Sequence, residues 1–370
     1  MKNQNFWYGK RVLVTGADGF VAANLIKKLL GLGAVVVGTV RHNRPIKTLE
    51  LLDEGEEKSS SPDIEFNDLL DFAATRRICD RHQIDTIFHL AAISIVSNAA
   101  NSPISTIENN VETTLNLLEV ARTNNIPRVV IVSTDKVYGD HANDTEETLP
   151  YREHYALRGL DVYSSSKVAA DMIAQTYAYQ YKLPVMITRA CNIYGPGDLN
   201  FTRLIPRTIM RLMEGKAPVI NIGNEHVLRE YIYVDDVVDA YLLLAEKTNE
   251  YYGQNLENMP SSGAKTYGWS AFNIGNYDKK DLAEVKKCDR IQSVTDIIAL
   301  LGARIKKIEP VIIPKPVNFI EIPDQYADAS KIRQLGFSPK TTMSDGIAKT
   351  VAWYTKHQEQ LAPLAEKYMN

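Results

Sequence analysis

The feature that most constrains the fold is a short apolar run that ends in a glycine-rich turn and leads into a helical pattern. Residues 11–15 (Arg-Val-Leu-Val-Thr) are typical of a buried strand, and apolar residues recur at helical spacing over residues 22–30. Between them lie Gly16 and Gly19. In this context the first glycine permits a tight turn, and the second lets backbone N–H groups approach a pyrophosphate at the start of a helix. The sequence therefore predicts a dinucleotide-binding unit here.

Apolar runs and helical stretches go on alternating beyond this unit. Strand-like runs stand at 34–37, 85–90, 128–132 and 184–188, and helical patterns at 107–123 and 166–181. Parallel strands that are joined by helices form sheets covered on both faces. We therefore expect an α/β fold with a Rossmann-type, doubly wound parallel sheet.

The second half of the chain predicts a smaller lobe that is interleaved with the sheet. We expect a dinucleotide-binding domain over residues 1–190, with segments returning near 225–250 and 270–300, and an α/β substrate lobe over 191–370. Amphipathic patterns predict helices at 291–301 and 343–354, whereas Gly, Asn, Pro and Ser crowd residues 251–270 and predict a loop. The charged stretch at 279–290 predicts a solvated insertion or the start of a helix.

Composition narrows the function classes. The chain has 42 Lys and Arg against 45 Asp and Glu, so its formal charge of −3 offers no basic excess for nucleic acid or an anionic membrane. Cys79, Cys191 and Cys288 are far apart and predict neither a metal site nor a disulfide framework. There is no signal-peptide pattern and no apolar run of about 18 residues. We therefore expect a soluble, cytoplasmic protein.

The end of the second predicted strand bears on which nicotinamide cofactor the site would take. An acid there would bind the ribose 2′-OH, whereas an arginine accommodates a 2′-phosphate. The chain has Arg41 and no acid, with Arg44 nearby, so NADP is favoured over NAD; the alternative is that both arginines are solvated surface charges. The predicted cofactor-binding residues are Gly16, Asp18, Gly19, Phe20, Val21, Arg41, Asp68, Leu69, Leu90, Ala91, Ala92, Tyr163 and Lys167.

Two segments carry candidate catalytic residues. Ser133 and Thr134 end one predicted strand, and Tyr163-Ser-Ser-Ser-Lys167 opens a later helix. The four-residue spacing places the tyrosine and the lysine on one helical face. Because an ammonium beside a phenol favours the phenolate, Tyr163 is the candidate base.

Together these motifs resemble the extended short-chain dehydrogenases/reductases that act on nucleotide sugars, over nearly the whole chain. The matching segments are 15–22, 88–92, 110–119, 133–139, 163–167, 189–196, 229–236 and 272–275. The resemblance implies that Tyr163 is the base, that Lys167 holds the nicotinamide ribose and lowers the tyrosine pKa, and that Thr134 hydrogen-bonds the sugar. Relatives commonly dimerise through two helices per subunit, here 103–122 and 163–181, so a homodimer is expected.

The pair after Thr134 distinguishes branches of this family. Asp135-Lys136 resembles the CDP-glucose 4,6-dehydratases, whereas 4-epimerases usually carry small or apolar residues at this place. The resemblance implies conversion of an NDP-hexose to its 4-keto-6-deoxy product, with Asp135 as the acid for the C6 hydroxyl and Lys136 as the candidate base for C5. The alternatives are a 4-epimerase, a 4,6-dehydratase of a GDP- or UDP-linked hexose, a noncatalytic relative, and a mere surface ion pair at Asp135-Lys136.

Five residues are predicted to bind the nucleotide sugar: Ser94, Thr134, Asn192, Arg203 and Arg229. The two arginines and Asn192 stand where relatives contact the nucleotide diphosphate, and the planar donors of arginine match phosphate oxygens. Ser94 is placed against the hexose. Gln325 stands where many relatives have an arginine, which argues against a second phosphate contact there.

Overall fold

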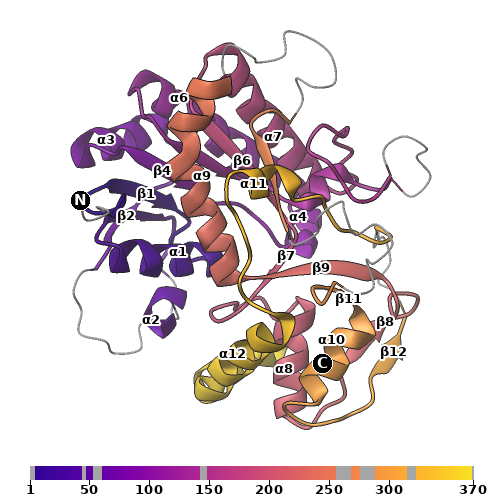
Figure 1. The fold of residues 1–370 in the computed structure, drawn as a ribbon. Coiled ribbons are helices and arrows are strands. Elements are labelled where there is room, and N and C mark those ends of the chain that lie inside the picture. Colours follow the sequence, from indigo (N-terminus) through magenta and orange to yellow (C-terminus); the bar gives the residue numbers. More distant parts are fainter. Residues whose placement is uncertain are drawn as a thin grey trace.

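A seven-stranded parallel sheet organises the molecule, in the order β10-β6-β5-β4-β1-β2-β3 (Figure 1). The computed structural model describes residues 5–43, 47–52, 61–141, 148–255, 268–275, 288–314 and 322–368. The strands of the sheet are β1 (Arg11–Thr15), β2 (Val35–Val40), β3 (Asp63–Phe66), β4 (Thr86–His89), β5 (Val129–Val132), β6 (Val185–Ala190) and β10 (Ala271–Ile274). Every neighbouring pair runs parallel. The predicted Rossmann-type α/β fold is confirmed.

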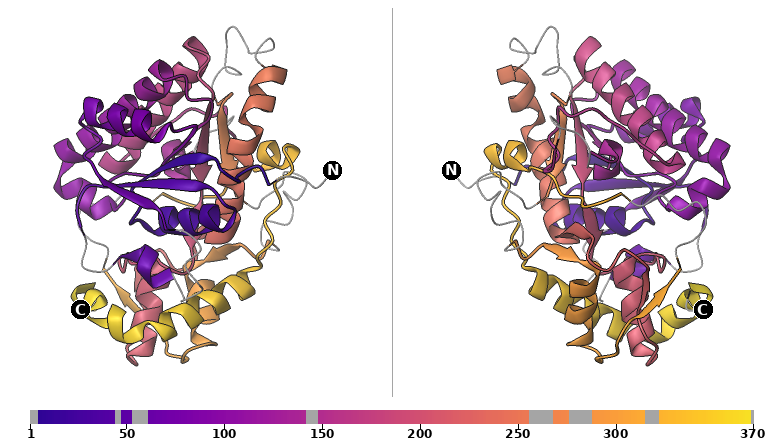
Figure 2. Two further views of the ribbon diagram at one scale, coloured as in Figure 1. Left: turned by 90° about the vertical axis from the view of Figure 1, so that its left-hand side faces the viewer. Right: turned by 90° about the vertical axis from the view of Figure 1, so that its right-hand side faces the viewer.

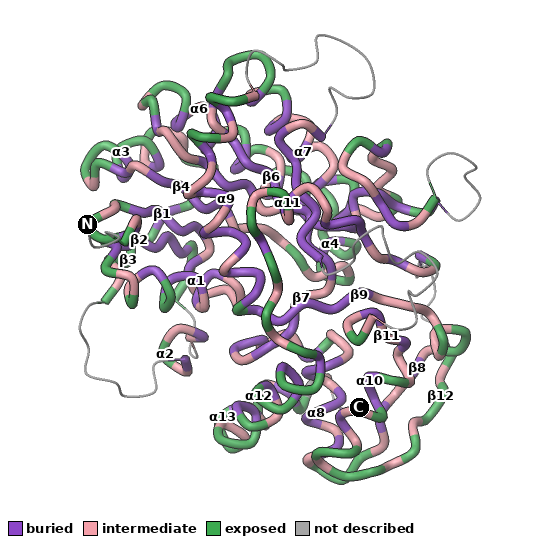
Figure 3. The backbone as a smooth tube through the Cα atoms, in the orientation of Figure 1, coloured by how far each residue is buried: buried purple, intermediate pink, exposed green. Residues whose placement is uncertain are grey.

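Helices cover both faces of this sheet (Figure 2). On one face α1 (Phe20–Gly31) packs beside α9 (Val234–Asn255); on the other, α3 (Phe72–His82), α6 (Thr113–Thr123) and α7 (Val162–Gln180) pack side by side. Central strands are therefore buried on both sides, as Figure 3 shows, and β6 is buried along its whole length. This double burial is why the strands are continuous apolar runs in the sequence.

Side-chain caps fix where two of these helices begin. The Asp71 carboxylate accepts a hydrogen bond from the Ala74 amide at 2.8 Å before α3, and Asp161 accepts one from the Ser164 amide at 2.9 Å before α7. Shorter helical segments complete this part of the fold: α2 (Thr48–Leu52), α4 (Val96–Asn101), α5 (Pro103–Ile107), η1 (Glu108–Glu112), η2 (Asp135–Tyr138) and α11 (Ser330–Gln334).

A second lobe with its own apolar core lies below the sheet in Figure 1. It holds the three-stranded sheet β11 (Ile291–Ser293), β9 (Leu228–Tyr233) and β7 (Asn192–Tyr194), and the pair β12 (Val311–Ile313) and β8 (Val219–Asn221). Its helices are α8 (Leu204–Met213), α10 (Val294–Gly302), α12 (Met343–Lys356) and α13 (Gln358–Ala365), followed by η5 (Glu366–Tyr368).

The helix predicted over 291–301 begins later than its apolar pattern indicates. Ile291–Ser293 pairs antiparallel with β9, and α10 starts only at Val294. Ser293 and Asp296 form a capping box, because each side chain accepts a hydrogen bond from the other residue's backbone amide. Strand pairing in the tertiary structure thus takes the first three residues of the pattern.

Of the segments that were expected to return to the sheet domain, some pack on the sheet and one packs in the second lobe. The segment near 225–250 supplies α9, which packs on the sheet, and within 270–300 β10 joins the sheet edge. α10, in contrast, packs against α8 and α12 of the second lobe. α9 extends through Asn255 into the segment predicted as a loop; residues 256–267 and 276–287, which hold most of that loop and of the charged stretch, lie outside the described residues.

The helices expected to form a dimer interface carry exposed apolar side chains. Ile104 is 71% exposed, and Ile107, Leu115 and Tyr181 are also exposed, whereas Leu117 and Leu118 on α6 are buried in the core. The homodimer stays a prediction. No helix within the described part of the chain combines the length and the apolar character needed to cross a membrane.

Candidate active site

The predicted cofactor residues gather where the strand order reverses. β1 and β4 are neighbours in the centre of the sheet, and the chain leaves β1 towards β2 and β3 on one side and β4 towards β5, β6 and β10 on the other. Loops at the carboxyl ends of strands form a crevice at such a point. Gly16 follows β1 and Ala91 follows β4, so the two predicted cofactor segments meet there.

Close approach of these two loops explains the need for glycine. Gly16 has φ +68°, and a Cβ atom at this position would lie 3.0 Å from Ala91 Cα. Thr15 joins the loops, because its hydroxyl accepts hydrogen bonds from the amides of Leu90 and Ala91, both at 3.1 Å. Sequence reasoning missed this role of Thr15, which has no signal beyond its place at the strand end.

The start of α1 fits a dinucleotide pyrophosphate. Gly19 is the N-cap residue and has no side chain to cap the first turn, so the backbone N–H groups of that turn stay available to an anion. Asp18, Phe20, Val21 and Ala92 are partly exposed around the crevice. The shape and the donors that these residues provide fit a nicotinamide dinucleotide.

The predicted cofactor residues that follow β2 and β3 lie towards one edge of the sheet. Arg41 is exposed, and its guanidinium donates to Asn109 Oδ1 at 3.0 Å; Arg44 lies outside the described residues. Asp68 is exposed and accepts from the Leu70 amide at 3.1 Å, and Leu69 is buried. The roles of Asp68 and Leu69 in binding a dinucleotide stay predictions.

The two catalytic segments meet at Thr134. Its hydroxyl donates to Asp135 Oδ1 at 3.2 Å and also interacts with the Tyr163 hydroxyl. Asp135 is only 2% exposed, and its Oδ2 atom has no hydrogen-bond partner among the described residues. Lys136 follows on η2 and is half-buried. The structure therefore brings Thr134, Asp135 and Tyr163 together, the arrangement that the family resemblance implies.

Burial dominates the electrostatics of Tyr163 and Lys167. Desolvation raises the pKa of Tyr163 to about 12, against the lowering effects of Arg203 and Thr134. Desolvation also lowers the pKa of Lys167 to about 8, and the Lys167 ammonium donates to the Val132 carbonyl at 2.5 Å. Arg203 is the cation whose charge lowers the pKa of Tyr163 against burial in this arrangement, and the effect expected of Lys167 on Tyr163 stays a prediction.

The neighbouring histidine has a structural role. His89, at the end of β4, is buried, and its ring nitrogens pair with the hydroxyls of Thr15 at 2.9 Å and Thr114 at 3.1 Å. Burial, together with the charge of Lys167, lowers the pKa of His89 to about 3. The imidazole is therefore neutral and holds the carboxyl ends of β1 and β4 in place.

The predicted substrate residues are distributed around this centre. Arg203 precedes α8 and pairs with the buried carboxylate of Asp198 at 3.0 Å. Arg229 donates to the carbonyls of Ile322 at 2.6 Å and Pro323 at 2.8 Å. Asn192 Nδ2 donates to the Glu230 carbonyl at 3.1 Å, and Ser94 is exposed. Their roles towards a nucleotide sugar stay predictions.

Asn110 is a further residue that sequence reasoning did not single out. It lies in η1, a π-helical turn, and its side chain accepts from the Ile93 amide at 2.8 Å and donates to Ser166 Oγ at 2.9 Å. It thereby joins the loop after β4 to α7 beside Lys167. A π-helical turn is a frequent mark of functional sites, but it becomes visible only in the backbone.

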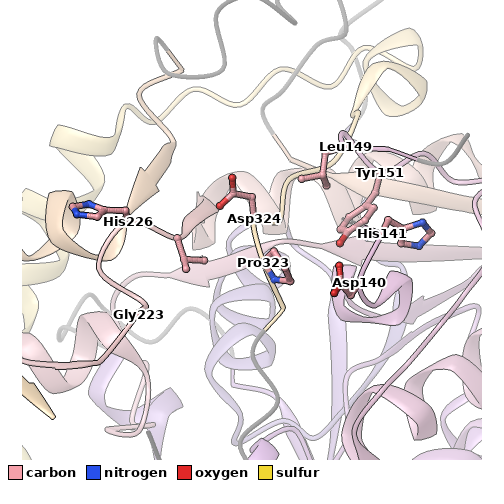
Figure 4. Close-up of a pocket in the computed structure, with 9 residues that line it drawn as sticks. Asp140, His141, Leu149, Tyr151, Gly223, His226, Pro323 and Asp324 are labelled. Carbon is pink, nitrogen blue, oxygen red and sulfur yellow. The ribbon is translucent and has the colours of Figure 1, made fainter. Parts of the chain in front are cut away.

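A cavity of about 360 Å³ opens next to the catalytic segment (Figure 4). Residues just beyond η2 form one side and residues of the second lobe form the other: Asp140, His141, Leu149, Tyr151, Gly223, His226, Val227, Pro323 and Asp324. None of the predicted catalytic residues lines it. Arg229 lies at its border, because it holds Pro323.

Fold and site together define a dinucleotide-binding α/β protein with a tyrosine, a lysine and a buried carboxyl group at the carboxyl edge of its sheet. The chain belongs to the NAD dependent epimerase/dehydratase family, a family of enzymes whose model matches residues 12–256.

Individual relatives agree with this assignment. The chain is 30% identical over 372 residues to a dTDP-glucose 4,6-dehydratase of Salmonella typhimurium, covering 93% of this chain and 92% of that protein. It is 28% identical over 359 residues to a trifunctional UDP-glucose 4,6-dehydratase/UDP-4-keto-6-deoxy-D-glucose 3,5-epimerase/UDP-4-keto-L-rhamnose-reductase of Arabidopsis thaliana; that match covers 95% of this chain but spans only 48% of the plant protein. The structure of a dTDP-glucose 4,6-dehydratase from Bacillus anthracis in complex with NAD is similar in fold, with a TM-score of 0.76 at 23% identity, covering 96% of this chain and 100% of that chain.

Proposed function

We propose that this enzyme is a nucleotide-sugar 4,6-dehydratase, which converts an NDP-hexose to the NDP-4-keto-6-deoxyhexose and recycles its nicotinamide cofactor in each turnover. The observation that carries the proposal is the buried carboxyl group of Asp135 beside Thr134, with Oδ2 unpartnered among the described residues. A 4-epimerase only oxidises and re-reduces C4, so it has no use for a second acid at this place. Loss of water from C5 and C6 requires one.

The proposed reaction assigns one task to each side chain. A bound nicotinamide would accept the hydride from C4 and return it to C6. Tyr163 takes the proton of the C4 hydroxyl as the ketone forms, and Thr134 hydrogen-bonds that oxygen. The ketone acidifies C5–H, Lys136 takes this proton, and Asp135 protonates the C6 hydroxyl so that it leaves as water. When hydride reaches C6, Lys136 returns a proton to C5, and the product is the 4-keto-6-deoxy sugar.

The nucleotide is a separate part of the proposal. The sequence favours CDP-glucose because of Asp135-Lys136, whereas the relatives named above act on dTDP-glucose or UDP-glucose. Gln325 is buried and neutral where many relatives would have an arginine, so Arg203 and Arg229 are the proposed diphosphate contacts. CDP-glucose therefore stands as the candidate to be tested beside the dTDP-, UDP- and GDP-linked sugars.

The proposal for the cofactor has two parts, the class of cofactor and the choice between NAD and NADP. A nicotinamide dinucleotide follows from the family, and the similar structure from Bacillus anthracis contains NAD. NADP rests on Arg41 alone, and the Arg41 guanidinium already donates to Asn109. Mass spectrometry of the dinucleotide released by denaturing the purified protein decides between them.

The function is tested by incubating the purified protein with CDP-, dTDP-, UDP- and GDP-glucose. We expect one of them to lose one water, seen by mass spectrometry, and to give the alkali-absorbing chromophore of a 4-keto-6-deoxy sugar. Asp135→Asn should slow this elimination by about 10²- to 10⁴-fold, the usual scale of positioned acid–base catalysis. Asp80→Asn, an exposed carboxyl on α3, is the matched control and should keep wild-type activity.

Two outcomes would contradict the proposal. An isomer of unchanged mass would identify an epimerase, the main alternative. Unchanged elimination by Asp135→Asn would remove this residue from the role of acid, since an amide cannot protonate the departing hydroxyl.

A further inference from the structure

A line of polar residues continues behind the catalytic pair along α7. Tyr163, Lys167, Asp171 and Gln175 are spaced four residues apart, so they follow one another on a single face of the helix. All four are buried. Tyr163 is the proposed base and Lys167 is the predicted contact of the nicotinamide ribose, but Asp171 lies one turn further from the site and has no assigned role.

Asp171 is held by a fully buried arginine of the neighbouring strand. Arg189 of β6 uses two nitrogens for this carboxylate, with Nε donating to Oδ2 and Nη2 to Oδ1, both at 2.9 Å. Gln175 Nε2 adds a hydrogen bond to Oδ1 at 2.7 Å. The exposed fractions of the two charged side chains are 1% for Arg189 and 0% for Asp171, so the pair is almost completely removed from water.

The third guanidinium nitrogen of Arg189 contacts η2, the segment that carries the proposed acid Asp135. Arg189 Nη1 donates to the Tyr138 hydroxyl at 3.0 Å and to the Glu153 carbonyl at 2.9 Å. Tyr138 is the last residue of η2, the short helix that begins with Asp135. Its hydroxyl donates in turn to Asn273 Oδ1 at 2.7 Å. One planar guanidinium thus contacts both segments that carry catalytic residues.

The packing of Tyr138 leaves η2 little freedom to shift. Tyr138 is fully buried, its ring lies 5.1 Å from the Arg189 guanidinium carbon, and it stacks on Tyr151 with ring centroids 4.8 Å apart. Tyr151 donates to the Gly139 carbonyl at 2.6 Å, which also holds the residue after η2. A lysine at position 189 would keep the charge for Asp171, but it lacks the rigid fork that reaches two partners in different directions.

We propose that Arg189 is a positioning residue, which fixes η2 against α7 and so holds Asp135 in place beside Tyr163. Arg189 acts through Tyr138 on one side and through Asp171 on the other. A buried ion pair alone adds little to stability compared with apolar residues of similar volume, whereas its directed hydrogen bonds fix the relative position of the two segments. For its effect on catalysis, this inference rests on the proposed dehydratase function.

Two variants test the contact between Arg189 and Tyr138 while a cation remains beside Asp171. Tyr138→Phe removes the hydroxyl that accepts from Arg189 Nη1 and donates to Asn273. Arg189→Lys keeps a cation for Asp171 but removes the Nη1 contacts with Tyr138 and Glu153. The matched control is Tyr252→Phe, which removes another buried tyrosine hydroxyl; that hydroxyl is bonded to Val185 at the opposite end of β6. We expect kcat for elimination to fall by about 10- to 100-fold in both variants, because a small misplacement of a reacting group has effects of this size. KM for the nucleotide sugar should stay near its wild-type value.

The double variant tests whether Arg189 works through Tyr138. If both residues serve one link, Tyr138→Phe combined with Arg189→Lys should be no slower than the slower single variant. Multiplying losses would mean independent roles and would overturn the proposed coupling. A change in KM with unchanged kcat would likewise place Arg189 in substrate binding rather than in positioning.

Hydrogen exchange supplies a readout that needs no substrate. In the purified protein, the backbone amides of residues 135–139 should exchange faster in Tyr138→Phe and in Arg189→Lys, but not in Tyr252→Phe. Wild-type exchange in both variants, or equal acceleration throughout the sheet, would refute the proposal. If the wild-type protein dehydrates none of the sugars, the proposed function fails, and the exchange experiment still decides whether Arg189 couples η2 to α7.

Discussion

Replacing Lys167 with methionine should stabilise the protein, although it removes the predicted contact with the nicotinamide ribose. The ammonium of Lys167 is buried, with 5% of the residue exposed, and desolvation lowers its pKa from 10.5 to about 8. The folded protein therefore binds a proton at this site less readily than the unfolded chain does. Below about pH 8 both states are protonated, and folding has to bury a charge. Methionine, which has a similar length and no charge, removes that cost.

The size of the effect follows from the shift. A lowering from 10.5 to about 8 corresponds to about 3 kcal/mol, at about 1.4 kcal/mol per pH unit. Between these two pH values the unfolded chain binds more protons, so the free energy of unfolding of the wild type rises with pH. Lys167→Met lacks this rise. Its stability advantage should therefore be largest at neutral pH and shrink by about 3 kcal/mol as the pH approaches 10.5.

Urea unfolding of both proteins at about pH 7 and about pH 10 measures this difference. Any change in packing between lysine and methionine is independent of pH, so only the change with pH is diagnostic. Lys28→Met, on the surface of α1 with its side chain 51% exposed, is the matched control and should keep the pH dependence of the wild type. If the free energies of unfolding of the wild type and Lys167→Met change in parallel with pH, the reasoning from a desolvated ammonium is refuted.

Three other substitutions test the glycine turn, a helix cap and the exposed surface of α5. Gly16→Ala forces a side chain into a site with φ +68° and only 3.0 Å to Ala91 Cα, so the purified protein should contain much less dinucleotide, at a stability cost of about 1 kcal/mol or more; normal dinucleotide content would contradict the crevice. Ser293→Ala removes half of the capping box and should lower the free energy of unfolding by about 1 kcal/mol in urea titrations, whereas no change would mean that the cap contributes nothing. Ile104→Glu places a charge on the exposed α5 surface and should convert the expected homodimer to monomer in analytical ultracentrifugation; a variant with the wild-type mass would exclude this face.

The structure adds a contribution from the second lobe to the surroundings of Tyr163 in the Tyr-x-x-x-Lys motif. Spacing alone predicts a phenol whose pKa is lowered by the nearby lysine. In the folded protein, burial raises the pKa of Tyr163, and the cation that opposes this effect is Arg203. Arg203 comes from the second lobe and is held by Asp198 at 3.0 Å. The position of the second lobe therefore affects the basicity of a residue that belongs to the sheet domain.

Local sequence patterns were sufficient for β1, β2, β4, β5 and β6, the glycine turn and the tyrosine–lysine pair, but they did not predict β3 and β10 as strands. Continuous apolar runs predict strands that are buried on both faces, and a spacing of four residues places side chains on one helical face, because both rules depend only on backbone geometry. They did not predict that 291–293 would pair with β9 rather than begin a helix. That outcome depends on a partner strand about sixty positions earlier in the chain.

What the sequence by itself determined is therefore the fold class and the residues that can meet at the carboxyl edge of the sheet. Only the tertiary structure decided which of these residues are buried away from water and which groups they contact. Asp171 and Arg189 are 18 positions apart and carry no common motif, yet folding buries them together beside the two catalytic segments. The physical reason is that desolvation and long-range pairing depend on everything that packs around a group, whereas backbone periodicity is set by near neighbours.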